Sequence, residues 1–272
     1  MIRYILKYIY IRILSYFELL IDVNPNKIQH KEIIVSMTTI PSRSLYLFET
    51  VNSILNQTVL PRKIYIGICQ KSLRENKLDY NIHLSIKNHP LVEIIYLDVD
   101  FGPIMKLITG LKVCKESDRI ITVDDDTIYS DRMIEYFIKE NSKNPDSVLC
   151  NIGRIHQEHF NIVTSKKVFR TAQQIDSLEG YGGVMYLPQF FNLNELLNFL
   201  EKASYSIKCN DDIVISIYLY NRKRKILSII TDINEPFTRV FFTQNTNPLW
   251  IENEKKNLQH LLNLELNEVY KI

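Results

Sequence analysis

Glycine, cysteine and net charge are all scarce in this chain. Seven of its 272 residues are glycine, where average usage of about 7% would give roughly nineteen, so a cluster of glycines is informative. The four cysteines are widely separated, with no CxxC or Cys/His spacing, which argues against a zinc site or a disulfide framework and favours free thiols. The formal net charge is +2, too weak a field to indicate nucleic acid as a partner.

Long uncharged runs are also missing, even in the apolar N-terminal segment. Four charged residues interrupt that segment: Arg3, Lys7, Arg12 and Glu18. No stretch of about 18 to 20 uncharged residues is left to cross a bilayer. The segment also lacks the small-residue cleavage site of a secretory signal, which argues against such a signal. We predict an amphipathic helix over residues 1–24, which either lies on a membrane surface or packs on the domain's own surface. The free cysteines and the missing secretory signal favour a cytoplasmic protein. If the protein is peripheral on a membrane, this helix would make the contact.

The first 140 residues alternate predicted strands and helices. Short β-branched runs predict strands at 32–37, 63–68, 92–97 and 120–123, and apolar residues at helical spacing predict helices near 47–55 and 104–111. Pro103 suits the first position of the second helix, and Ser130 suits the cap of a third. This pattern predicts an α/β, Rossmann-like fold with a mostly parallel central sheet flanked by helices, whose ligands bind beyond the carboxyl ends of the strands.

The second half is less regular, with a predicted helix at 193–200 and another that begins near Asp211. We treat residues 30–272 as one catalytic domain, divided into halves at 30–140 and 141–272. No internal repeat or low-complexity linker argues for a further domain.

Three consecutive aspartates, Asp124, Asp125 and Asp126, follow the fourth predicted strand. Crowded carboxylates repel one another and lose hydration, so such a triplet indicates a bound cation or a ligand that brings one. The alternative is a solvated acidic turn. Another acidic pair, Asp211-Asp212, opens an apolar helix, where it either takes part in catalysis or simply favours the positive end of the helix.

Five segments in this order resemble the GT-A class of nucleotide-sugar glycosyltransferases, in particular the DxD-containing, family-2-like members. They are SMTTIPSR (36–43), FGPIMKL (101–107), VDDDTIY (123–129), EGYGGVMY (179–186) and CNDDIVIS (209–216). The resemblance implies a GT-A fold and the transfer of a sugar from a nucleotide-sugar, most simply a UDP-sugar. The acceptor would be a hydroxyl of a glycan or of a lipid-linked molecule.

On the donor side, the resemblance implies that Asp124 and Asp126 are the two aspartates of the DxD motif and bind Mn²⁺ or Mg²⁺. Such a cation neutralises charge that develops on the leaving diphosphate. Several further residues would lie beside the donor: Thr38, Pro41, Arg43, Gly102, Lys106, Asp124 and Asp125. Arg43 and Lys106 would reach its phosphates; the alternative for each is a solvated residue near a helix start.

On the acceptor side, the resemblance implies a general base at Asp212, or less directly at Asp211, and therefore an inverting transfer. A glycine-rich loop would lie where donor sugar and acceptor meet: Glu179, Gly180, Tyr181, Gly182 and Gly183. Glycine permits close backbone approach, but the same loop could be an ordinary hairpin turn. His156 is a weaker candidate for the acceptor side, and His260 for a metal ligand.

Two other functions remain open. A sugar nucleotidyltransferase on a similar sheet would also use carboxylates and a metal, but it normally has a glycine-rich loop after the first strand, and SMTTIPSR contains no glycine. A non-catalytic, transferase-like glycan-binding protein would need neither a metal nor a base, and both acidic clusters count against it.

Overall fold

The computed structural model describes residues 2–75, 79–156, 165–169, 171–229, 231, 237–240, 265–266, 269 and 271. The helices are α1 (Ile2–Tyr16), η1 (Ser44–Tyr46), α2 (Leu47–Leu55), α3 (Leu84–Lys87), α4 (Met105–Val113), α5 (Met133–Lys143), η2 (Gly180–Gly182), η3 (Pro188–Phe190), α6 (Leu193–Lys202), α7 (Tyr205–Lys208) and α8 (Asp211–Asn221). The strands are β1 (Ile28–Thr38), β2 (Val59–Cys69), β3 (Val92–Leu97), β4 (Arg119–Thr122), β5 (Thr127–Tyr129), β6 (Ser147–Cys150), β7 (Ile152–Ile155), β8 (Lys166–Phe169), β9 (Gln173–Gln174), β10 (Ser177–Leu178), β11 (Val184–Tyr186), β12 (Lys225–Ser228) and β13 (Phe237–Arg239).

The central sheet has eight strands in the order β3-β2-β1-β4-β11-β6-β12-β9. The first four are parallel to one another, whereas β11 runs antiparallel to both β4 and β6. β1 and β4 end side by side, with Ser36 opposite Thr122. The segments that follow these two strands, including the three aspartates, therefore leave the sheet at the same edge.

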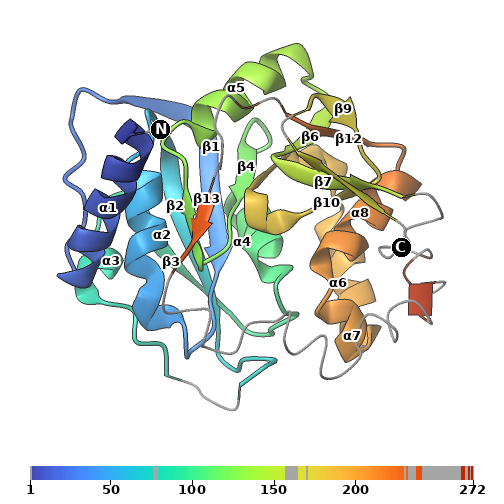
Figure 1. Cartoon of the computed structure of the whole chain (residues 1–272). Helices are drawn as coiled ribbons and strands as arrows, with labels where there is room; N and C mark the ends of the chain where they lie inside the picture. The colour runs from blue at the N-terminus through green and yellow to red at the C-terminus, as the bar shows by residue number, and fades with distance from the viewer. Residues whose placement is uncertain are drawn as a thin grey trace.

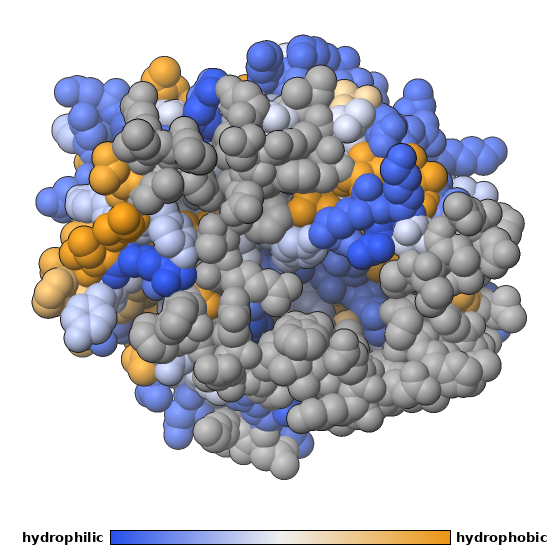
Figure 2. Space-filling view, in the orientation of Figure 1, coloured by the Kyte–Doolittle hydropathy of each residue, from blue (hydrophilic) through white to orange (hydrophobic). Residues whose placement is uncertain are grey.

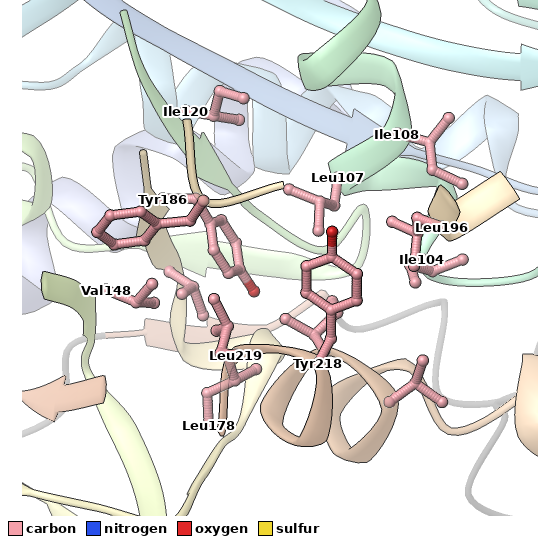
Figure 3. Packing of buried hydrophobic residues seen from close by; sticks show 14 of the residues in the cluster. Ile104, Leu107, Ile108, Ile120, Val148, Leu178, Tyr186, Leu196, Tyr218 and Leu219 are labelled. Carbon is pink, nitrogen blue, oxygen red and sulfur yellow. The ribbon is translucent and has the colours of Figure 1, made fainter. Parts of the chain in front are cut away.

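Helices cover both faces of the sheet, which gives three layers (Figure 1). Successive residues of β1 alternate between two separate cores, as the period of two of a strand requires. Ile34 belongs to a core with residues of α4, α6 and α8, whereas Ile33 and Val35 belong to a core with residues of α1, α2 and α5. Figure 3 shows the first core, where Tyr186 of β11 and Tyr218 of α8 lie among aliphatic side chains. This core joins α4 to α8 beneath the site described below.

α1 packs on α2 through the buried Ile11 and the partly buried Tyr8 and Leu14. Its outward face remains apolar and exposed: Leu6, Ile9, Tyr10, Ile13 and Tyr16. Figure 2 shows apolar side chains at the edge where α1 lies in Figure 1. Among the residues that the structure describes, no helix combines the length and the apolar character that a membrane span requires.

The prediction that the first helix continues to residue 24 is wrong. α1 ends at Tyr16, and Glu18 takes a positive φ of 55° that cannot continue a right-handed helix. Asn24 instead organises a later turn, accepting a hydrogen bond from the Asn26 N–H at 2.9 Å and from the Lys27 N–H at 2.9 Å.

The predicted alternation of strands and helices is confirmed, and β3 has the predicted limits. Two helix starts were predicted wrongly. α4 begins at Met105, so Pro103 lies in the turn before it. α5 begins at Met133 with Arg132 at its cap, and Ser130 accepts a hydrogen bond from the Arg132 N–H at 3.3 Å, which organises the turn before the helix instead.

Candidate active site

A cavity of ≈ 490 Å³ opens beyond the carboxyl ends of β1 and β4 and is lined by both halves of the chain. Its described lining contains seven carboxylate residues: Asp100, Asp124, Asp125, Asp126, Glu179, Asp211 and Asp212. It also contains four cationic residues: Arg43, Arg74, Lys106 and Arg154. Carboxylates thus outnumber cations in the described lining, which by itself is a poor host for an anion unless a further cation enters with it.

Asp124 and Asp126 direct their carboxylates to the cavity, and each is paired with a cation. Asp124 Oδ1 lies 2.7 Å from Lys106 Nζ, and its side chain is 28% exposed. Asp126 Oδ2 lies 2.8 Å from a guanidinium nitrogen of Arg43, and its side chain is 20% exposed. Both aspartates therefore keep part of their surface open to an incoming ligand.

Asp125 turns into the protein instead. It is 3% exposed, accepts a hydrogen bond from Thr39 Oγ1 at 2.5 Å and lies 3.1 Å from Arg43. Burial raises the pKa of Asp125 to about 6, although the charge of Arg43 opposes the shift. Thr50 Oγ1 donates to its carbonyl at 2.9 Å, so the backbone of the triplet is also held. The central aspartate thus anchors the segment and steadies Arg43.

Lys106 lies between the two acidic clusters. Its Nζ is 2.7 Å from Asp124 Oδ1 and 3.2 Å from Asp211 Oδ2. Burial alone would lower the pKa of Lys106, but the neighbouring carboxylates, Asp124 first, raise it well above its usual value. These carboxylates therefore favour the protonated, cationic form of the Lys106 side chain at the centre of the site.

Asp211 and Asp212 open α8, with Asn210 at its cap. Burial raises the pKa of Asp211, and the charge of Lys106 opposes that shift. Burial, followed by the charge of Asp211, raises the pKa of Asp212 well above the usual range of an aspartate. A carboxylate of raised pKa that faces a cavity has the property that general-base catalysis requires.

The glycine loop packs against protein side chains. The N–H of Gly180 donates to Asp212 Oδ1 at 3.0 Å, Gly182 accepts from Asn151 Nδ2 at 2.7 Å, and Gly183 has a φ of +87° that favours glycine. Glu179 and Tyr181 line the cavity, whereas these three glycines are not part of its described lining.

Of the remaining residues predicted to lie beside the donor, some line the cavity and one does not. Thr38, Arg43 and Gly102 line the cavity, but Pro41 does not appear in its described lining. The carbonyl of Pro41 accepts a hydrogen bond from Ser44 Oγ at 2.9 Å. Pro41 therefore shapes the turn that carries Arg43.

Sequence reasoning missed a second ionic group, which surrounds Glu179. Arg154 of β7 lines the cavity and pairs with Glu179 at 2.5 Å. Lys167 of β8 lies 3.3 Å from the other oxygen of Glu179 and donates to the Tyr181 hydroxyl. No sequence signal identifies Arg154, because its partner lies 25 residues away. His156 is beside this group, with Nε2 2.6 Å from Ser177 Oγ, while His260 lies outside the described residues.

Within the described part of the chain, no group of three or more His, Cys, Asp or Glu side chains is arranged to hold a metal ion. Asp124 and Asp126 nevertheless offer partly open carboxylate oxygens. Mg²⁺ commonly binds through one or two carboxylates while water and substrate phosphates complete its coordination. The oxygen donors present thus fit a hard divalent cation that arrives with a phosphate ligand.

Comparison with known families agrees with this architecture. The model of glycosyl transferase family 2 matches residues 39–202, which is more than half of the chain. The chain belongs to glycosyl transferase family 2. This membership favours the transferase over the nucleotidyltransferase that the sequence left open. The match ends before Asp211, so the acidic pair of this family 2 chain must be assigned from geometry.

Solved structures with a similar fold include S. aureus TarS 1-349 in complex with UDP, at 15% identity and a TM-score of 0.51 over 78% of this chain and 61% of that one. A second structure of TarS 1-349 has 14% identity and a TM-score of 0.46 over 79% and 60%. The family 2 chain thus spans about three fifths of the length of these two solved chains. No curated protein matches its sequence.

Proposed function

We propose that this protein is a metal-dependent, inverting glycosyltransferase that moves a sugar from a UDP-sugar to a hydroxyl of a glycan or lipid-linked acceptor. The observation that carries the proposal is the meeting of two acidic clusters, Asp124 to Asp126 and Asp211-Asp212, at one cavity beyond the strand ends. Residues 30–140 form the donor-binding half, and residues 141–272 form the acceptor-binding half.

The donor side of the proposal rests on charge. A nucleoside diphosphate is anionic, whereas the described cavity lining has more carboxylates than cations. Asp124 and Asp126 would hold Mn²⁺ or Mg²⁺, and the bound cation would neutralise charge on the diphosphate leaving group. Arg43 would lie beside the same phosphates. The choice of UDP is supported by the nucleotide named in the TarS structure that shares this fold.

The acceptor side rests on Asp212. Its raised pKa and its place in the cavity lining suit a general base. It would take the proton of the acceptor hydroxyl while that oxygen bonds to the anomeric carbon, and the bond from this carbon to the diphosphate would break on the opposite face. The Gly180 N–H fixes one oxygen of the base at 3.0 Å. Attack opposite to the leaving group gives inversion.

A panel of nucleotide-sugars should be screened for metal-dependent hydrolysis, followed by calorimetry with UDP in Mn²⁺, in Mg²⁺ and in EDTA. We expect turnover with a UDP-sugar, and UDP binding that weakens at least about tenfold in EDTA and in Asp124→Asn and Asp126→Asn variants. Asp146→Asn removes an exposed carboxylate elsewhere and should bind normally. Equal UDP binding in EDTA would exclude the metal, and no turnover with any nucleotide-sugar would refute the function.

We also propose that the outward face of α1 rests on an anionic membrane surface. Its apolar residues are exposed, which suits contact with such a surface. Residues 2–16 contain three basic and no acidic side chains, of which Lys7 pairs with Asp131 of the protein itself. The wild-type protein should sediment with phosphatidylserine vesicles, and an Ile9→Ser/Ile13→Ser variant should sediment several-fold less. Equal sedimentation of both proteins, or none by the wild type, would contradict this contact.

A further inference from the structure

Lys106 touches both halves of the cavity. Its side chain is 5% exposed, and its ammonium contacts Asp124 at 2.7 Å and Asp211 at 3.2 Å. Asp124 follows β4, whereas Asp211 is the first residue of α8. One buried cation therefore joins the donor side of the cavity to the helix that carries the proposed base.

The start of α4 is fixed from two directions, which holds this ammonium in place. Ser36 Oγ donates to the carbonyl of Lys106 at 2.7 Å, which ties α4 to β1. Gly102 has a φ of +84°, and a Cβ at this position would lie 2.6 Å from the carbonyl of Lys208 in α7. The loop before α4 is thus packed against the chain that leads into α8.

The carboxylate of Asp211 is paired with the Lys106 ammonium, whereas the carboxylate of Asp212 accepts a hydrogen bond from a different partner. Asp211 is buried, and its Oδ2 makes no hydrogen bond of good geometry within the described chain. The Lys106 ammonium, 3.2 Å away, compensates its charge. Asp212 accepts from the Gly180 N–H instead. The two neighbouring carboxylates therefore have different nearest partners, the Lys106 ammonium for Asp211 and the Gly180 N–H for Asp212.

We propose that Lys106 is a positioning residue that clamps Asp124 to Asp211 and so holds the donor site and the Asp212 base in one arrangement. This inference rests on the proposed function and gives Lys106 a task other than contact with a donor phosphate. Since Lys106 acts through Asp124 and Asp211, its loss should disturb alignment for the reaction more than affinity for the nucleotide.

Steady-state kinetics and UDP calorimetry of Lys106→Met test this distinction. We expect kcat to fall about 100-fold, while the Kd for UDP in the presence of Mn²⁺ stays within about fivefold of the wild type. Lys112→Met, an exposed substitution in the same helix, should keep both values. If Lys106→Met loses UDP affinity about 100-fold and keeps its kcat at saturating donor, the lysine binds the donor directly and the proposal is wrong.

Urea unfolding of Lys106→Met, Asp211→Asn and the double variant tests the pairing without any activity assay. Removing the cation alone leaves buried carboxylates uncompensated, so adding Asp211→Asn to Lys106→Met should raise the midpoint of unfolding. If the losses of stability in the two single variants simply add in the double variant, the proposed clamp is wrong. If Lys106→Met does not fold, the double variant decides: folding of the double variant supports the pairing, and its failure to fold contradicts the pairing. If the wild-type protein shows no turnover, the proposed function is refuted. The unfolding measurements on these three variants then still test whether Lys106 pairs with Asp211.

Discussion

Gly180→Ala is the substitution that most directly tests how the site is built. A Cβ at this position would lie 2.8 Å from Asp212 Oδ1 and 2.8 Å from Lys106 Nζ, whereas ordinary contact begins at 3.4 Å. Each of these two atoms would have to retreat by about 0.6 Å. The methyl group therefore displaces both the proposed base and the cation beside it.

The magnitude follows from that displacement. A misplacement of about 1 Å in an active site can cost about 100-fold in rate, and the 3.0 Å hydrogen bond from the Gly180 N–H to Asp212 would weaken at the same time. We expect kcat to fall between about 10-fold and 100-fold. Both displaced atoms are ends of side chains, and Gly180 is not among the glycines with positive φ. The free energy of unfolding should consequently change by less than about 1 kcal/mol.

Gly182→Ala is the matched control, because it makes the same substitution two residues further along the loop. Its Cβ would meet Ile152 at 3.1 Å and would leave Asp212 and Lys106 untouched. UDP release from the best donor of the nucleotide-sugar screen, measured with saturating acceptor, gives kcat, and urea unfolding gives stability. The reasoning is refuted if Gly180→Ala keeps more than about half of the wild-type kcat, or if the two variants lose kcat equally.

Two further predictions concern pH and stability. Because a base must be ionised to accept a proton, kcat/KM should fall as the pH drops through the raised pKa of Asp212. A profile that stays flat throughout the acidic range in which the protein remains folded would contradict this role. Arg62 makes two 2.6 Å hydrogen bonds to the fully buried Asp118, so Arg62→Met should lower the free energy of unfolding by about 3 kcal/mol in urea titrations. Arg132→Met, which breaks a more exposed pair with Glu135, should cost less than about 1 kcal/mol, and equal losses would argue against burial as the cause.

The parallel half of the fold was predictable because its signals are local. A buried strand such as β4 appears in the sequence as one short β-branched run, and α2 appears as apolar residues at helical spacing. The antiparallel insertion of β11 was not predictable. Its three residues, Val184–Tyr186, pair with β4 and β6, which lie far from them in sequence, and so short a segment has no distinctive period.

The candidate site was also predictable in part: the position of the aspartates was, and their partners were not. The triplet Asp124 to Asp126 follows a strand and so had to emerge at the ligand-binding edge of the sheet. The sequence could not place Lys106 between this triplet and Asp211, because the contact needs α4 and α8 to meet across the core of Figure 3. Arg154 escaped notice for the same reason, since its carboxylate partner is supplied by a distant loop.

The sequence by itself determined the class of fold, the kinds of chemical group available and their positions after strands, because period, turn residues and strand ends are properties of neighbouring residues. Tertiary structure decided the use of each group. It turned Asp125 inward to Thr39 and Arg43, while Asp124 and Asp126 stayed partly open to the cavity. Three adjacent aspartates have the same chemistry, so only partners brought from distant segments could give them different tasks.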